Sequence, residues 1–138
     1  MFKSEAQRST VCGLILESVG LSHLWDAQGP TEQACEWHTK PRTMPGFSHG
    51  ELIMWQFAWE VWNETGKFHM GEAMATLDGI NLHTIGSLIV ALSGCGSDVD
   101  HWIAAQDARH EVTRRRRAER EKQAQAKLAQ AKLLRSVP

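Results

Sequence analysis

Apolar residues recur along the chain at helical spacing, three or four residues apart, and this pattern predicts a protein built from α-helices. The first predicted helix follows Ser4, whose hydroxyl suits the unpaired N–H groups of a helix start, and it ends at Gly20. Thr31 is the expected N-cap of a second helix that runs through about residue 38. No stretch shows the apolar–polar alternation of a strand, so we expect no sheet.

The strongest local signal is the pair Ser48 and Glu51, which has the spacing of a capping box. In this motif each side chain accepts a hydrogen bond from the other residue's backbone N–H. The helix that follows is expected to stop at Gly66. Few of its positions are polar, so we expect this apolar helix, over about residues 49–64, to be the central helix of the fold.

Three tryptophans of this helix, Trp55, Trp59 and Trp62, are spaced four and three residues apart and therefore share one face. Two interpretations are open. The indoles are either core side chains, which is the usual role of such a stripe, or an exposed aromatic anchor for a partner protein.

The rest of the chain is also predicted to be helical. The prolines in residues 40–46 favour a loop, and a short helix is expected over about residues 71–77. Asn81 is the expected cap of the next helix, and Ser97 with Asp100 resembles a capping box for a last one.

The last predicted helix is longer than the remainder of the protein is wide. A helix over about residues 98–135 would be roughly 57 Å long, whereas a body of about a hundred residues is roughly 35 Å across. The expected architecture is therefore an all-α, compact multi-helix body with a long basic C-terminal helix that projects from it. We predict two parts, an acidic body (residues 1–108) and a basic extension (residues 109–138).

The charge pattern supports this division. Residues 1–108 carry thirteen acidic and five basic residues, a net charge of −8, whereas residues 109–138 carry ten basic and three acidic residues, a net charge of +7. Such asymmetry implies a partner for the basic part. The partner could be nucleic acid, an anionic surface, or the acidic body of a second copy of this chain.

Within the basic extension, four consecutive arginines point to all sides of a helix, which favours general attraction to acidic groups over the reading of bases in one groove. Ala124, Leu128, Ala131 and Leu134 form an apolar stripe that could seat the helix on another helix. The expected partner-binding residues are Arg114, Arg115, Arg116, Arg117, Arg120, Lys122, Leu128 and Leu134.

No catalytic or metal motif is complete. Cys35 and His38 form a single pair of potential zinc ligands, where a structural site needs four ligands. Residues 61–72 have the spacing of a calcium-binding EF-hand loop, but Val61 stands where the first ligand would be. Cys95 and His101 lack a third group to orient them. We therefore expect no metal, no cofactor, no small-molecule substrate and no enzyme activity.

The three cysteines are widely spaced and odd in number, which favours free thiols in the cytoplasm. We find no signal peptide and no apolar run long enough to cross a membrane. The sequence therefore predicts a non-enzymatic interaction or assembly module, expected to be a homo-oligomer or to bind a protein partner through its basic helix. The alternative is a nucleic-acid-binding protein whose basic helix contacts phosphates.

Overall fold

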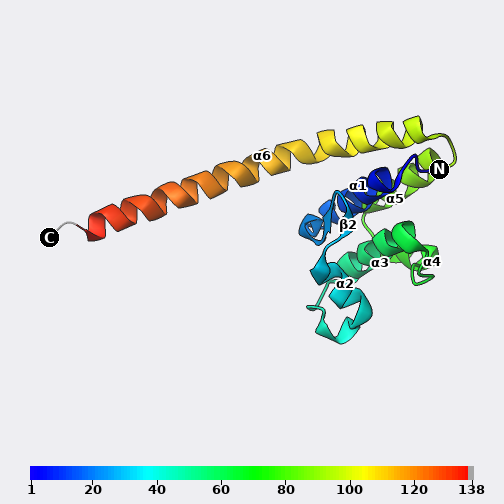
Figure 1. Ribbon diagram of the computed structural model, residues 1–138, viewed down its shortest axis with the longest axis horizontal. Helices are drawn as coiled ribbons and strands as arrows, with labels where there is room; N and C mark the ends of the chain where they lie inside the picture. The colour runs from blue at the N-terminus through cyan, green and yellow to red at the C-terminus, as the bar shows by residue number, and fades with distance from the viewer. Residues whose placement is uncertain (137–138) are drawn as a thin grey trace. The chain divides into compact units, whose positions relative to one another are not determined.

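The computed structural model describes residues 1–136 of the chain. The helices in these residues are α1 (Glu5–Glu17), α2 (Glu32–Thr39), α3 (His49–Asn63), α4 (Met70–Thr76), α5 (Gly79–Leu92) and α6 (Gly96–Arg135), joined in part by 3-10 turns at Ser22–Leu24 and Pro41–Thr43 (Figure 1). The predicted all-α fold class is confirmed.

The chain divides into two units, Met1–Gln106 and Asp107–Pro138. The first contains α1 to α5 and the beginning of α6, and the second contains the rest of α6. The predicted division into an acidic body (residues 1–108) and a basic extension (residues 109–138) stays a prediction. Residues 137 and 138, the end of that extension, lie outside the described residues.

A small hairpin is the exception to the helical fold. The strands β1 (Trp25–Asp26) and β2 (Gly29–Pro30) pair antiparallel, so the prediction of no sheet is wrong here. Strands of two residues are too short to produce an alternating pattern. The turn also depends on Gly29, whose φ of +137° favours glycine, and a Cβ there would lie 3.0 Å from the indole of Trp62.

Most of the predicted helix starts are confirmed. The side-chain oxygens of Ser4, Thr31 and Ser48 each accept the backbone N–H of the residue three positions further along. At α3 the reciprocal bond is also present, because the Glu51 carboxylate accepts the Ser48 N–H at 2.9 Å. This completes the capping box and satisfies donors that a helix start would otherwise leave unpaired.

The end of α1 also follows the sequence pattern. Gly20 has a left-handed backbone with φ of +76°, where glycine is favoured. Its N–H donates to the Glu17 carbonyl at 3.1 Å, and the Leu21 N–H donates to the Leu16 carbonyl at 2.9 Å. This is the Schellman arrangement, which pairs carbonyls at the end of a helix and turns the chain towards the hairpin.

Three predicted helix boundaries need correction. Helix α3 ends at Asn63, close to the expected end at about residue 64, but the left-handed residue that ends it is Glu64, with φ of 54°, in place of the expected Gly66. Helix α5 is capped by Asp78, whose carboxylate accepts the Asn81 N–H at 2.8 Å, so Asn81 lies inside the helix. The 3-10 turn at Pro41–Thr43 lies within the predicted loop.

The third correction concerns α6. Its first turn is closed by Asp98, whose carboxylate accepts the Cys95 N–H at 2.8 Å, and Ser97 and Asp100 form no capping box. Asp100 instead accepts a hydrogen bond from the Gln7 side-chain amide at 2.8 Å and pairs with Lys3. A tertiary contact with the N-terminal part of the chain therefore takes the place of the predicted local one.

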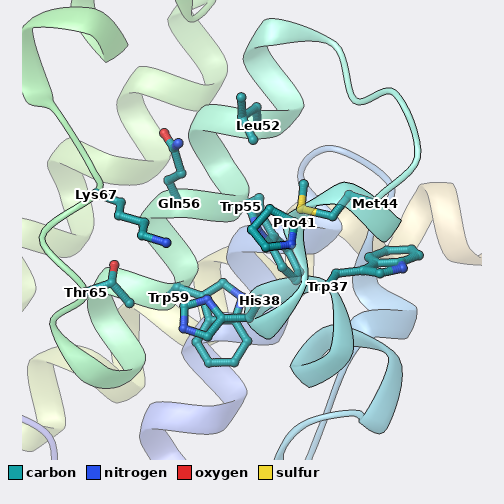
Figure 2. Close-up of a pocket in the computed structure, with 10 residues that line it drawn as sticks. All are labelled: Trp37, His38, Pro41, Met44, Leu52, Trp55, Gln56, Trp59, Thr65 and Lys67. Atoms are coloured by element: carbon teal, nitrogen blue, oxygen red, sulfur yellow. The ribbon is translucent and has the colours of Figure 1, made fainter.

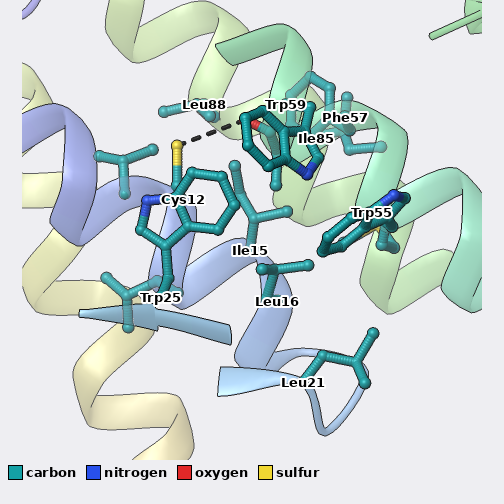
Figure 3. Close-up of a cluster of buried hydrophobic side chains, with 14 of the residues drawn as sticks. Cys12, Ile15, Leu16, Leu21, Trp25, Trp55, Phe57, Trp59, Ile85 and Leu88 are labelled. Carbon is teal, nitrogen blue, oxygen red and sulfur yellow. Dashed lines mark hydrogen bonds between the residues drawn. The ribbon is translucent and has the colours of Figure 1, made fainter. Parts of the chain in front are cut away.

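Helix α1 packs against α3, and side chains from α1, α3, α5 and the start of α6 meet in one core (Figure 3). The Cys12 thiol donates to the Ala58 carbonyl at 3.4 Å, and burial raises the pKa of this thiol well above its usual range. The fully buried large side chains include Val11, Ile15, Leu16, Ile53, Met54, Ile85, Leu88 and Val99. Each such side chain stabilises the fold by about 1.5–3 kcal/mol relative to exposure.

Candidate functional site

The predicted partner-binding residues all lie on one exposed segment of α6. Every residue from 111 to 136 is exposed, and these residues are helical through Arg135. At 3.6 residues per turn, successive side chains are about 100° apart, so Arg114 to Arg117 project to all sides of the helix. The segment therefore presents positive charge around its whole circumference.

The helix itself neutralises two of these arginines. Arg114 pairs with Asp107 at 3.0 Å and Arg115 pairs with Glu111 at 2.6 Å. Between residues 114 and 122, the basic side chains that form no ion pair within residues 1–136 are those of Arg116, Arg117, Arg120 and Lys122. We call these four residues the free basic cluster. They can bind an acidic partner without first breaking a pair.

The leucines of the segment do not form one narrow seam. Leu128 is 62% exposed and Leu134 is 70% exposed. Being six residues apart, they lie about 120° apart around the helix. Leu133, which is 69% exposed, lies on yet another side. These leucines can add apolar contact to an interface, but their arrangement is not that of a coiled-coil stripe.

The tryptophan face of α3 is mostly interior. Trp55 and Trp59 are each only 4% exposed, and Trp62 is half-buried. Trp25 packs edge-on against Trp59, with ring centroids 5.1 Å apart, and against Trp62 at 5.8 Å. Trp55 and Trp59 are therefore core side chains, the first of the two interpretations, because the hairpin and α2 cover the face on which they lie. They do not protrude as an anchor.

The same tryptophans line a pocket of about 290 Å³, which we call the tryptophan pocket (Figure 2). Helix α2, the segment after it, α3 and the segment after α3 all contribute to its wall. The lining residues are Trp37, His38, Pro41, Met44, Leu52, Trp55, Gln56, Trp59, Thr65 and Lys67. The pocket is just below the roughly 300 Å³ at which small-molecule sites begin, and its wall is largely apolar, as theirs are.

The polar groups of the tryptophan pocket are few. The His38 ring stacks on Trp59, with centroids 3.9 Å apart and planes 13° apart. Burial, and secondly the positive charge of Lys67, hold the pKa of His38 below its usual value and so favour the neutral ring. The buried indole N–H of Trp59 has no hydrogen-bond partner among residues 1–136. None of the ten lining residues is acidic.

Sequence reasoning missed this pocket. It treated His38 only as a potential zinc ligand and gave Trp37 and Lys67 no role. No spacing rule connects Lys67 to residues of α2, because the loops between them decide whether they meet. The one usable signal was the density of aromatic residues in α2 and α3.

The residues considered for a metal site or for nucleophilic catalysis do not come together in the described part of the chain. Within residues 1–136, no three His, Cys, Asp or Glu side chains are grouped so that they could hold a metal ion. The carboxylate of Glu72, the last residue of the EF-hand-like spacing, pairs with His49.

Cys95 is exposed at the start of α6, and the Ser97 hydroxyl lies 2.9 Å from its sulfur. The hydrogen bond with this hydroxyl, followed by those with the backbone N–H groups of Asp98 and Ser97, lowers the pKa of the Cys95 thiol. Within residues 1–136 no hydrogen bond joins Cys95 to His101, the base that nucleophilic catalysis would require.

In residues 1–136, no helix combines the length and the apolar character needed to cross a membrane. No protein-family model matches the chain, and comparisons with curated proteins and with solved structures gave no match.

Proposed function

We propose that this protein is a non-enzymatic interaction or assembly module, whose basic C-terminal helix docks on an acidic surface of another protein chain. In this proposal α3 is the centre of an acidic body, and the basic helix extends from it. The observation that carries the proposal is the free basic cluster, four exposed cations with no ion pair among the described residues. The module would act in the cytoplasm, where its three free cysteines stay reduced.

A second copy of the chain is the first partner to test. Residues 1–108 carry a net charge of −8, which complements the +7 of residues 109–138. Two copies could therefore each offer a basic helix to the other's acidic body, an exchange typical of closed symmetric dimers. The exposed leucines of the helix would add apolar contact to this charge attraction.

The experiment is size-exclusion chromatography with light scattering on the full chain, with absorbance read at 260 and 280 nm. Raising the salt from about 0.1 M to about 1 M shortens the Debye length from about 10 Å to about 3 Å, so an electrostatic oligomer should dissociate. Deleting residues 112–138 should also reduce the mass to that of a monomer while circular dichroism shows a folded body. An oligomer that survives both changes would contradict the proposal for self-assembly.

Two variants separate charge from helix structure. Replacing Arg116, Arg117, Arg120 and Lys122 together by glutamine should weaken docking as the deletion does. The matched control replaces the three arginines by lysine, which keeps the charge, and docking should persist. If the glutamine and lysine variants bind equally well, the free basic cluster has no part in docking.

Nucleic-acid binding is the second candidate, and the all-round positive charge of the segment favours it. Binding through the phosphates of duplex DNA should then weaken with salt. Four contacts from the free basic cluster would give a slope of about −3.6 in a plot of log K against log salt. The absence of aromatic residues from residues 109–136 argues against base stacking. A full chain that purifies with excess absorbance at 260 nm would favour this candidate over protein docking.

A further inference from the structure

We propose that the tryptophan pocket binds a small molecule that combines a flat apolar ring system with one anionic group such as a carboxylate. The pocket lies within residues 37–67, so this inference is independent of the basic helix and of the function proposed for it. It adds a ligand class that the sequence did not indicate.

The shape and wall of the pocket select a flat apolar body. Trp55 and Trp59 present their rings at 73° to each other, with centroids 5.8 Å apart, and Trp37 packs edge-on against Trp55 at 6.3 Å. Leu52 and Met44 complete the apolar lining (Figure 2). These angles describe contacts among the three rings themselves, so a planar ligand would reach the half-buried Trp37 and only the small exposed part of Trp55 and Trp59. Room of about 290 Å³ suits a ligand of one or two fused rings.

The charges around the pocket select an anion. Lys67 lines the pocket, is exposed, and has no ion pair among residues 1–136, so its ammonium group is available to a ligand. No lining residue is acidic, so nothing in the wall would compete for that ammonium group. The half-buried Gln56 amide is a further donor in the wall, and a carboxylate accepts from such a group.

A cationic ligand is the main competitor, because tryptophan faces also attract ammonium groups. Two features of the site disfavour it. Lys67 would repel a second cation in a pocket that contains no carboxylate to offset the repulsion. One face of Trp59 is already covered by the His38 ring, so it is not open to a cation.

The test uses three probes with the same ring system: 2-naphthoate, the neutral 2-naphthamide, and 2-naphthylmethylammonium. Each is titrated into the full ¹⁵N-labelled chain, and the chemical shifts of the six tryptophan indole N–H signals are followed. We expect 2-naphthoate to shift the signals of Trp37, Trp55 and Trp59 saturably, with a dissociation constant of about 1 mM or lower. The signal of Trp102, which lies outside the pocket, should not move. The amide should bind more weakly, and the ammonium probe weakest.

Lys67→Met gives the decisive comparison, because Lys67 is exposed and its replacement leaves the core intact. This variant should bind 2-naphthoate about threefold to fivefold more weakly, as expected for loss of a partly exposed ion pair, and 2-naphthamide unchanged. The matched control is Lys40→Met, which removes an exposed lysine that does not line the pocket and should change neither affinity.

Three results would overturn the proposal. The first is the absence of any shift of the pocket tryptophans at millimolar 2-naphthoate. The second is tighter binding of the ammonium probe than of 2-naphthoate. The third is an equal loss of 2-naphthoate binding in Lys67→Met and Lys40→Met. The weaker binding would then follow from the net charge of the protein and not from the position of Lys67.

Discussion

Residues 1–106 and residues 111–135 are both largely helical, but different forces stabilise their helices. In the first region the helices bury large apolar side chains in a common core. In the second region every residue is exposed, and the helix depends on good helix formers and on local pairs such as Glu111 with Arg115. A helix of the first kind unfolds together with the core, whereas a helix of the second kind can unfold while the core stays folded.

Proline placed inside a helix of each region should give the largest difference between the two regions. Proline in a helix interior removes a hydrogen bond and clashes with the preceding turn, at a cost of about 3 kcal/mol or more. Ala58→Pro lies in the buried part of α3 and should abolish the native fold. Ala126→Pro lies in the exposed part of α6 and should reduce helical circular dichroism while leaving the urea unfolding midpoint of the core unchanged. A large loss of core stability in Ala126→Pro would show that the two regions unfold together.

A leucine truncation in each region gives the next largest difference. Leu16 is fully buried, so Leu16→Ala should lower the free energy of unfolding by about 2–5 kcal/mol through lost burial and a cavity. Leu128 is 62% exposed, and Leu128→Ala should change it by less than about 0.5 kcal/mol. Both changes in the free energy of unfolding can be measured by urea unfolding followed by tryptophan fluorescence. Similar losses in the two variants would show that Leu128 is buried in solution, as it would be in an oligomer.

The capping box of α3 predicts an intermediate effect. Ser48→Ala removes the acceptor for the Glu51 N–H and should cost about 1 kcal/mol in the free energy of unfolding. Glu51→Gln keeps an acceptor for the Ser48 N–H and serves as the control, with a smaller loss expected. The same unfolding assay separates them, and a glutamine variant less stable than Ser48→Ala would point to the charge of Glu51 as the main contribution.

The smallest expected effect is a pH dependence at the tryptophan pocket. The unfolded chain takes up a proton at His38 near the ordinary pKa of 6.5, whereas the folded protein does so only at lower pH, because burial and the charge of Lys67 lower that pKa. The unfolded state therefore binds more protons just below pH 6.5, and this contribution to stability is present above that pH and is lost as the pH falls. Thermal unfolding of wild type and His38→Gln, compared from about pH 7.5 to about pH 5.5, should show a smaller decline in the variant. An equal fall in unfolding temperature for wild type and variant would show that His38 does not cause the pH dependence of stability.

Local features of the fold followed from the sequence because each depends on a few neighbouring residues. The caps at Ser4, Thr31 and Ser48 are bonds across three residues, and the turn at Gly20 requires only one residue with a left-handed backbone. Such interactions form in the same way in any fold that leaves the segment helical. The all-α class and the asymmetry of charge are likewise properties that the order of residues alone determines.

Prediction failed at the start of α6, where a distant part of the chain supplied the partner, and at the end of α3. Asp100 contacts Lys3 and Gln7, which are more than ninety residues away in the sequence, instead of capping its own helix. The left-handed residue that ends α3 is Glu64, two positions before the expected Gly66, although glutamate has no preference for this conformation. The contacts of Asp100 cannot be obtained from spacing within one segment.

The sequence by itself determined which segments are helical, where most helices begin, and that the basic charge is concentrated after residue 108. Only the tertiary structure decided that Trp55 and Trp59 are buried, that His38 stacks on Trp59, and that Lys67 lines the same pocket. The physical reason is the range of the forces involved. Helix propensity and capping act within one turn, whereas a pocket exists only after burial of apolar surface has brought α2, α3 and their loops together.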